Sequence, residues 1–294
     1  MRVPAKVNLA LNVGATDNEG YHALGTLFQA VSLFDDLVAR PAEAGVFRVS
    51  FRGEGASGLP VDDTNLVIRA ARLLAETCGT GNPGAEIRVH KRIPVAGGMA
   101  GGSADAAATL VACNQLWGTG LDTGQLHAVA ARLGADVPFL LHGGTAVGTG
   151  RGEKLRPVPV RGSFQWVLAL SHHGLSTPAV FREFDRISAP QPTDIDSGLL
   201  EALADGDARR VGALLRNDLQ RAAFNLQPEL ADVLAMGREA GAAGALVSGS
   251  GPTIAFLAGT PAVADAISDR LALSSRVRAV RRAHGPVPGA RIVN

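Results

Sequence analysis

The chain has 294 residues, of which 46% are hydrophobic and 19% are charged, a composition that suits a globular protein with a sizeable core and argues against disorder. Its formal net charge is +1, so no overall field favours a nucleic acid or an anionic membrane as a partner. Two cysteines, Cys78 and Cys113, are too few for a disulfide framework and wrongly spaced for zinc, and no apolar stretch has membrane-spanning length, so we expect a cytoplasmic protein with reduced thiols.

The first half of the chain predicts strands and helices in alternation. Residues 3–12 alternate between apolar side chains and a polar face with Lys6, Asn8 and Asn12, which is typical of a half-buried strand beside a cleft. We expect further strands over 46–52 and 85–91, and helices over 65–78, 103–117 and 123–133. Asp62, Asp63 and Thr64 are the candidate caps of the first helix, which Gly79 ends.

The second half begins after a glycine-rich loop over 148–153. Thr177 is expected to cap a helix whose first residue is Pro178, and three breakers predict a loop over 189–197. The remaining elements are strands near 166–170, 244–248, 253–257 and 276–281, and helices near 198–217, 228–240 and 261–272. The fold class is therefore α+β, and we expect two domains, residues 1–155 and 156–294.

A glycine-rich segment, residues 94–107, follows a predicted strand and runs into a helix. Glycines let backbone N–H groups turn toward an anion, and a helix N-terminus adds partial positive charge. The spacing fits neither the P-loop nor the dinucleotide fingerprint. The segment therefore predicts a polyphosphate site, the alternative being a tight turn without a ligand.

Two charged residues become candidates for catalysis if such a loop binds a polyphosphate. Asp136 lies between a helix stop and an apolar run, where a capping aspartate is the simpler interpretation. Lys6 lies on the polar face of the first strand, where a lysine at the edge of the sheet is the simpler interpretation. Lysine is rare in this chain, however, and occurs only as Lys6, Lys91 and Lys154. A kinase needs groups that position the nucleophile, take its proton and neutralise phosphoryl charge, and this pair supplies them.

Two shorter motifs suggest ligand contacts. The turn over 248–253 is a hairpin turn or a backbone anion nest that closes over the phosphates, and both interpretations stay open. Tyr21, His22 and Phe28 are residues that can stack on and hydrogen-bond a base. The adjacent pair His172 and His173 has no third ligand at a suitable spacing, so no metal site is expected there.

Three of these motifs in order resemble the GHMP kinase superfamily: residues 94–107, the strand over 4–9, and residues 249–253. Residues 20–22, 134–139, 148–154 and 177–181 resemble the branch that phosphorylates a cytidine-diphosphate sugar alcohol on the non-mevalonate route to isoprenoid precursors. The resemblance implies a ribosomal S5 domain 2-like N-terminal domain that binds ATP and a ferredoxin-like C-terminal domain. It also implies ATP and Mg²⁺ as cofactors, and a small-molecule substrate handled by a monomer or weak homodimer.

The resemblance also implies roles for individual residues. Asp136 matches the catalytic base and Lys6 the lysine that supports it. The ATP site is expected to comprise Asn65 together with Pro94, Val95, Ala96, Gly97, Gly98, Met99, Ala100, Gly101, Gly102, Ser103 and Ala104. The substrate site is expected to comprise Asn8, Tyr21, His22, Phe28, Thr177, Phe181, Gly249 and Ser250.

The phosphate loop departs from the family pattern, which has Leu, Gly and Ser where this chain has Met99, Ala100 and Ala104. Because a Cβ penalises left-handed geometry, we expect Ala100 to have a negative φ. Ala104 lacks a hydroxyl that could contact phosphate or Mg²⁺, which leaves Ser103 as the better candidate. Two alternatives remain: a homoserine- or mevalonate-type kinase of the same superfamily, and a nucleotide-binding sensor without turnover.

Overall fold

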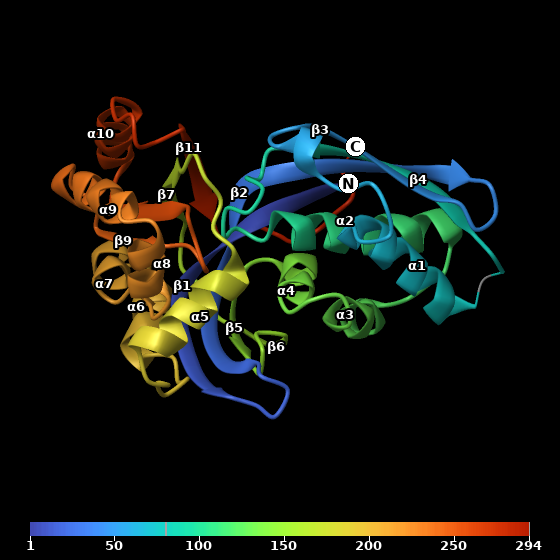
Figure 1. Cartoon of the computed structure of the whole chain (residues 1–294), viewed down its shortest axis with the longest axis horizontal. Coiled ribbons are helices and arrows are strands. Elements are labelled where there is room, and N and C mark those ends of the chain that lie inside the picture. Colours follow the sequence, from blue (N-terminus) through green and yellow to red (C-terminus); the bar gives the residue numbers. More distant parts are fainter. Residues whose placement is uncertain (80, 294) are drawn as a thin grey trace.

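The computed structural model describes residues 1–79 and 81–293, and it divides into a larger and a smaller β-sheet that lie side by side (Figure 1). Helices pack on both sheets, so the α+β expectation is confirmed. Across those residues, every helix is too short or too polar to cross a membrane.

The larger sheet has seven strands in the order β3-β4-β2-β1-β8, with β5 paired to β2 and β6 paired to β5. Most of its pairs are antiparallel, but β3 with β4 and β1 with β8 are parallel. The strands are β1 (Arg2–Thr16), β2 (His22–Ala42), β3 (Phe47–Gly53), β4 (Gly84–Lys91), β5 (Thr145–Thr149), β6 (Lys154–Pro157) and β8 (Arg216–Asn217).

Four helices of the first half pack together beside this sheet (Figure 1). They are α1 (Leu66–Cys78), α2 (Gly101–Trp117), α3 (Thr123–Ala131) and α4 (Val137–His142), and a short 3-10 turn, η1 (Ala56–Gly58), follows β3. The central helix α2 is buried on most sides, and a run of alanines over 106–108 lets it approach its neighbours closely. The sheet and α2 together hold the phosphate loop at the helix start.

The smaller sheet is antiparallel, in the order β11-β7-β10-β9. Its strands are β7 (Phe164–Leu170), β9 (Gly244–Val247), β10 (Ile254–Ala258) and β11 (Ala279–Gly285). The helices of this half are α5 (Thr177–Ile187), α6 (Ser197–Asp205), α7 (Ala208–Ala213), α8 (Gln220–Leu226), α9 (Glu229–Glu239) and α10 (Pro261–Ala272).

The division at residues 155 and 156 stays a proposal. It falls within β6, which still pairs with β5 of the larger sheet. The short strand β8 also returns from the second half to pair with β1.

Several elements differ from the prediction. The helix expected over 198–217 is two helices and a strand, because Gly206 adopts a left-handed conformation and the side chain of Asp207 caps a new helix. The strands β2, β5 and β6 and the helices α4 and α8 were not predicted. The last strand begins at Ala279 rather than residue 276, because the Val277 N–H is used in a turn with Ser274.

Helix α1 is capped by none of the predicted residues. Its N-cap is Asn65, whose side chain accepts a hydrogen bond from the Val67 N–H at 2.9 Å. Asp62 instead closes the preceding turn by accepting from the N–H and the hydroxyl of Thr64. The C-terminal stop at Gly79 is confirmed, and its left-handed φ of 59° is one that glycine adopts readily. Likewise Ser176, not Thr177, occupies the N-cap of α5.

A buried charge cluster ties three elements together beneath the phosphate loop. Lys91 of β4 donates to Asp35 of β2 and to Asp105 of α2, the latter at 2.6 Å, and all three side chains are almost fully buried. Burial raises the pKa of the Asp105 carboxyl well above its usual range. Burial opposes the charge on Lys91, but the two carboxylates outweigh it and raise the pKa of that lysine.

Replacing Lys91 with Met is expected to lower the free energy of unfolding by about 3–5 kcal/mol, because two buried carboxylates lose their counter-charge. Urea denaturation measures this change. The matched control is Arg72→Met, which breaks an exposed pair with Asp63 and should cost about 0–1 kcal/mol. Equal losses in the two variants would contradict a role of the buried cluster in stability.

Candidate active site

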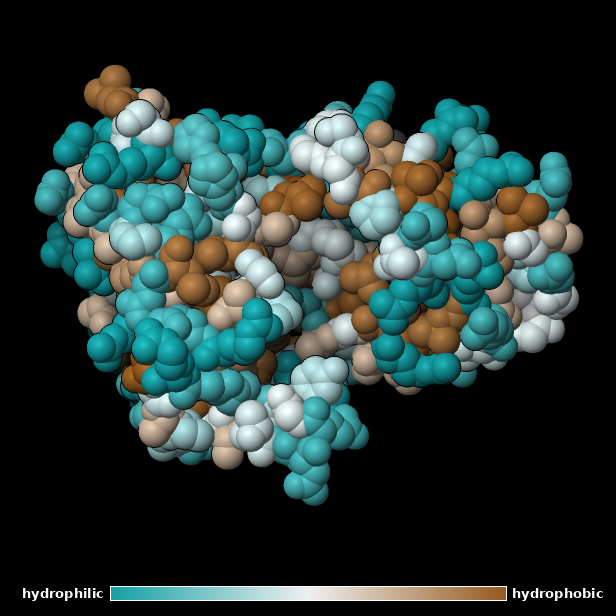
Figure 2. Space-filling model, in the orientation of Figure 1, coloured by the Kyte–Doolittle hydropathy of each residue, from teal (hydrophilic) through white to brown (hydrophobic). Residues whose placement is uncertain are grey.

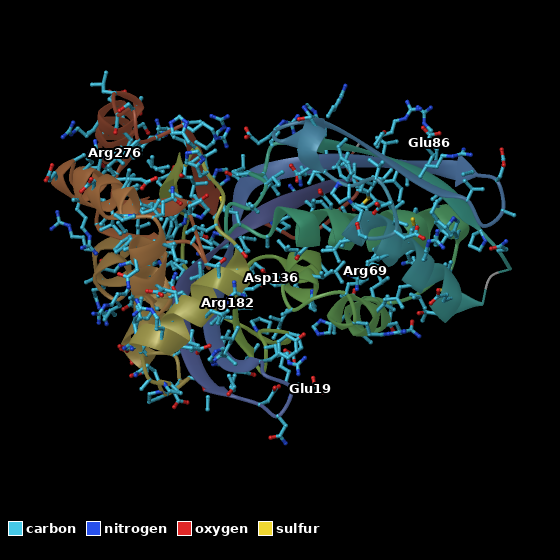
Figure 3. The ribbon with its side chains drawn as sticks, in the orientation of Figure 1. Glu19, Arg69, Glu86, Asp136, Arg182 and Arg276 are labelled. Atoms are coloured by element: carbon cyan, nitrogen blue, oxygen red, sulfur yellow. The ribbon has the colours of Figure 1, made fainter. Side chains whose placement is uncertain are left out.

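A cleft of about 590 Å³ lies between the two halves of the molecule. The space-filling view shows the surface hollowed between the two lobes (Figure 2). Figure 3 places Asp136 at the boundary between the halves, beside the end of α5. Residues from both halves line the cleft, so it could not be assembled from either half alone.

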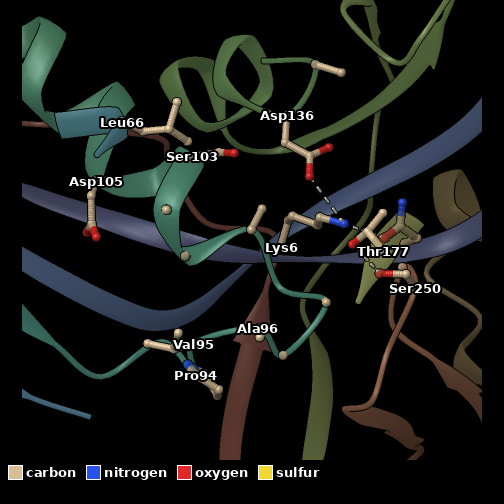
Figure 4. Close-up of a pocket in the computed structure, with 18 of the residues that line it drawn as sticks. Lys6, Leu66, Pro94, Val95, Ala96, Ser103, Asp105, Asp136, Thr177 and Ser250 are labelled. Atoms are coloured by element: carbon tan, nitrogen blue, oxygen red, sulfur yellow. Dashed lines mark hydrogen bonds and ion pairs between the residues drawn. The ribbon is translucent and has the colours of Figure 1, made fainter. Parts of the chain in front are cut away.

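Lys6 and Asp136, the predicted catalytic pair, meet in this cleft. The Lys6 Nζ lies 3.7 Å from the Asp136 Oδ2, and Figure 4 shows the two side chains pointing toward one another. The lysine is buried, whereas 32% of the aspartate side chain is exposed. Asp136 occupies the N-cap position of α4 but caps nothing with its side chain, so the carboxylate is available for chemistry.

A chain of hydrogen bonds fixes the position of the Lys6 ammonium group. Its Nζ donates to the Asn8 Oδ1 at 2.6 Å, and the Asn8 Nδ2 donates to the Thr26 hydroxyl at 2.8 Å. That hydroxyl donates in turn to the Ala10 carbonyl at 3.0 Å. The ammonium also lies 5.5 Å from the centre of the Phe28 ring, within the range of a cation–π interaction. Neighbouring positions of β1 and β2 therefore hold the charge in place.

The phosphate loop runs along the cleft and into α2. The first N–H groups of a helix have no intrahelical partner, and Gly102 and Ser103 of this first turn line the cleft. Backbone donors and the helix dipole thus face the cavity together, which is how a protein binds phosphate without a side chain for each oxygen.

The backbone of the loop differs from the prediction at Ala100. Its φ is 60°, in the left-handed region, and Ala96 has a φ of 51°. The expectation of a negative φ at Ala100 is therefore wrong. Among the glycines at 97, 98, 101 and 102, only Gly98 has a positive φ, at 72°, so the left-handed residues of the loop are Ala96, Gly98 and Ala100. Ala100 is the N-cap from which α2 starts.

The turn between β9 and β10 packs directly against the phosphate loop. The Ser248 hydroxyl donates to the Gly98 carbonyl at 3.1 Å, and a Cβ on Gly98 would overlap the Ser248 carbonyl oxygen. Gly249 is less crowded, although a Cβ there would lie 3.2 Å from the Lys6 Nζ. Gly249 and Ser250 line the cleft, and the Ser250 hydroxyl is 2.8 Å from that of Thr177.

One end of the cleft is largely apolar and contains the predicted nucleotide residue Asn65. Its Nδ2 donates to the Pro60 carbonyl at 2.7 Å, so this side chain mainly shapes the wall. The apolar residues around it were not predicted, because side chains of this kind carry no motif: Phe51, Leu59, Pro60 and Leu66. Ligand pockets are lined mainly by apolar and aromatic side chains such as these.

The other end of the cleft contains Phe28, Thr177 and Phe181 among the predicted substrate residues. Tyr21 and His22 do not line the cavity. The His22 ring stacks on Phe181 with 5.3 Å between ring centres, and its Nε2 is 3.0 Å from the Asp185 Oδ1. The Tyr21 ring lies outside the cavity beneath a guanidinium, that of Arg151, 3.8 Å from its centre.

Two other predicted residues are also outside the cavity, because the side chains of Met99 and Ala104 are fully buried in the core. The Met99 carbonyl accepts a hydrogen bond from the Lys6 N–H at 3.3 Å, so it steadies the loop from behind. Arg151 lines the cleft and was missed as a site residue, although its flanking glycines, 150 and 152, drew attention to the loop. The other predicted residues all line the cavity.

Comparisons with known proteins agree with this architecture. The model of the GHMP kinases N terminal domain matches residues 65–144, and that of the GHMP kinases C terminal domain matches residues 199–274. The chain therefore belongs to the GHMP kinase family.

Individual relatives show which branch of the GHMP kinases the chain resembles. The chain is 54% identical to 4-diphosphocytidyl-2-C-methyl-D-erythritol kinase of Nocardia farcinica, over 100% of this chain and 96% of that protein. It is 52% identical to the protein of the same name from Streptomyces coelicolor, over 100% and 99% of the two chains. Within the GHMP kinases, the chain is a member of the family that these relatives represent.

Solved structures of GHMP kinases also match the chain. A crystal structure of 4-(cytidine 5'-diphospho)-2C-methyl-D-erythritol kinase has a TM-score of 0.76 and 35% identity, and the match covers 97% of this chain and 98% of that one. Homoserine kinase from Cytophaga hutchinsonii also has a TM-score of 0.76, over 98% and 94% of the two chains, but only 22% identity, so it supports the fold alone.

Replacing Ala100 with Gly is expected to raise the free energy of unfolding by about 1 kcal/mol, because glycine adopts a positive φ without a Cβ clash. Urea denaturation measures the change. The control, Ala235→Gly, lies at an exposed interior position of α9 and should lose about 1 kcal/mol. A loss of stability in both variants would show that Ala100 is unstrained.

Proposed function

We propose that this chain transfers the γ-phosphate of ATP to the 2-hydroxyl of 4-diphosphocytidyl-2-C-methyl-D-erythritol, giving the 2-phosphate and ADP. The observation that carries the proposal is the Lys6–Asp136 pair, with 3.7 Å between the Nζ and the Oδ2, in a cleft that also contains the phosphate loop. The relatives of the same family name support this choice of substrate. The product would feed isoprenoid precursor synthesis by the non-mevalonate route, and we place the activity in the cytoplasm.

Asp136 is suited to take the proton of the acceptor hydroxyl. Its carboxylate is partly exposed to the cleft, and its side chain makes no capping bond that catalysis would have to break. Lys6 is fixed by Asn8 and lies beside both the carboxylate and the turn at Gly249. The lysine can therefore orient Asp136 and offset the negative charge that collects on the transferred phosphoryl group.

The two ends of the cleft suit the two substrates. The apolar end beside Asn65 and Leu66 would receive the adenine, and the start of α2 would hold the phosphates (Figure 4). The end with Phe28 and Phe181 would receive the cytidine, with aromatic rings to stack on the base. This arrangement brings the acceptor hydroxyl and the γ-phosphate together near Lys6.

The oxygen donors of the cleft suit Mg²⁺, which prefers oxygen ligands and is often held mainly by substrate phosphates. Ser103, in the first turn of α2, is the candidate protein ligand, and Ala104 offers no second hydroxyl. Among the described residues, no three His, Cys, Asp or Glu side chains gather closely enough to hold an ion by themselves. When bound with ATP, Mg²⁺ would neutralise charge on the phosphates.

The decisive test is ADP release from ATP and Mg²⁺ with three acceptors in parallel: 4-diphosphocytidyl-2-C-methyl-D-erythritol, homoserine and mevalonate. We expect release with the cytidyl compound alone. Release with homoserine or mevalonate instead would assign a different kinase of the superfamily. Nucleotide binding without release from any acceptor would identify a sensor.

Asp136→Asn is expected to lower kcat by about 10²–10⁴-fold while ATP still binds, because the amide cannot take a proton. Steady-state kinetics and ATP titration measure the two effects. Asp122→Asn is the matched control: Asp122 caps α3 outside the cleft, and asparagine is an equally good cap, so kcat should not change. A near-normal kcat for Asp136→Asn would remove this residue from the mechanism.

A further inference from the structure

Asn217 is a buried polar residue that does not line the cleft, yet it holds the turn that does. Its Nδ2 donates to the carbonyl oxygens of Val247 and Gly249, each at 2.7 Å. Its Oδ1 accepts from the Leu219 N–H at 2.9 Å. The side-chain amide thus uses both of its N–H groups on the backbone of a single turn.

The hydrogen bond to Gly249 fixes the direction of an N–H group on the next residue. The Gly249 carbonyl and the Ser250 N–H belong to one planar trans peptide, in which the two groups point in opposite directions. Because Asn217 binds the carbonyl, the N–H of Ser250 is directed away from Asn217. Ser250 lines the cleft, and the structure shows no acceptor for its N–H among the described residues.

This N–H lies beside the groups that surround the transferred phosphate. A Cβ built on Gly249 would be 3.0 Å from the Gly98 carbonyl and 3.2 Å from the Lys6 Nζ. The turn therefore contacts the phosphate loop and the catalytic lysine at the same point. A backbone donor without a partner at this place is suited to bind an anionic oxygen.

We propose that Asn217 is a positioning residue that directs the Ser250 N–H toward the phosphates of ATP. The proposal rests on the proposed function, because it assigns this N–H to the phosphoryl group that the kinase transfers. Asn217 would then affect turnover indirectly, through the peptide group that joins Gly249 to Ser250. Donors held in advance toward developing negative charge are among the largest contributors to catalysis.

The surrounding segment is held independently of the Asn217 amide, so variants at this position should still fold. The Asp218 carboxylate accepts from the Val13 N–H at 3.0 Å, which ties the segment to β1. The Gln220 side chain accepts from the Val247 N–H at 3.0 Å, which ties it to β9. Removing the amide of Asn217 therefore frees the turn while the flanking strands stay in place.

The first test is Asn217→Asp, which keeps the shape and the acceptor for Leu219 but sets a carboxylate oxygen against two carbonyl oxygens. We expect kcat to fall about 10–100-fold, somewhat less than the loss of a whole oxyanion donor, with the KM for the acceptor changed less than about threefold. The matched control is Asn114→Asp. Asn114 braces a loop away from the cleft in the same way, with bonds to the carbonyl and the N–H of Leu121 at 3.0 and 3.1 Å.

The control should lose thermal stability without a change in kcat. If Asn217→Asp also keeps its kcat and loses only stability, Asn217 is merely structural and the proposal is overturned. If kcat falls only in proportion to the folded fraction, the proposal is overturned as well.

A second measurement does not depend on the acceptor. In an ¹H–¹⁵N spectrum of the whole chain, a non-hydrolysable ATP analogue should shift the Ser250 amide resonance in the parent protein but not in Asn217→Asp. An unmoved resonance in the parent would overturn the proposal. Because this readout needs no turnover, it stays valid if every acceptor fails and the proposed function is abandoned.

Discussion

The site depends above all on one contact between the halves of the molecule, the hydrogen bond from the Ser248 hydroxyl to the Gly98 carbonyl. The first half supplies the phosphate loop and both members of the Lys6–Asp136 pair. The second half supplies a turn that fits only because Gly98 has no side chain. Without this close approach, the start of α2 would face open solvent rather than an enclosed cleft.

Much of the fold and of the site could be predicted from local sequence patterns. The start of α10, the end of α1 and the strand with Lys6 follow from periodicity and breakers, which act over a few residues. The glycine-rich segment was recognisable because a strand, a turn and a helix N-terminus succeed one another directly. What these features share is that their physical cause lies within about one turn or strand of the residue concerned.

The features that sequence reasoning missed depend on contacts between distant segments. Lys91 and Asp35 are 56 residues apart, and nothing near either residue indicates the pairing. Arg151 lines the cleft from the turn between β5 and β6 and stacks on Tyr21 of a distant segment. The Asn217 side chain donates to a carbonyl 32 residues further along. The one signal in the sequence that pointed to these buried charges was the rarity of lysine. Lys6 and Lys91 both form ion pairs inside the molecule, whereas Lys154 is exposed.

The left-handed alanines of the phosphate loop have a consequence for how nucleotide binds. Glycine at such a position would leave the free loop many conformations, and each would have to be given up on binding. Ala96 and Ala100 restrict that freedom, and Gly98 between them is held against the second half by its hydrogen bond from Ser248. We therefore expect the loop to be ordered before any nucleotide arrives. An ordered loop lowers the entropy cost of the ATP binding proposed above.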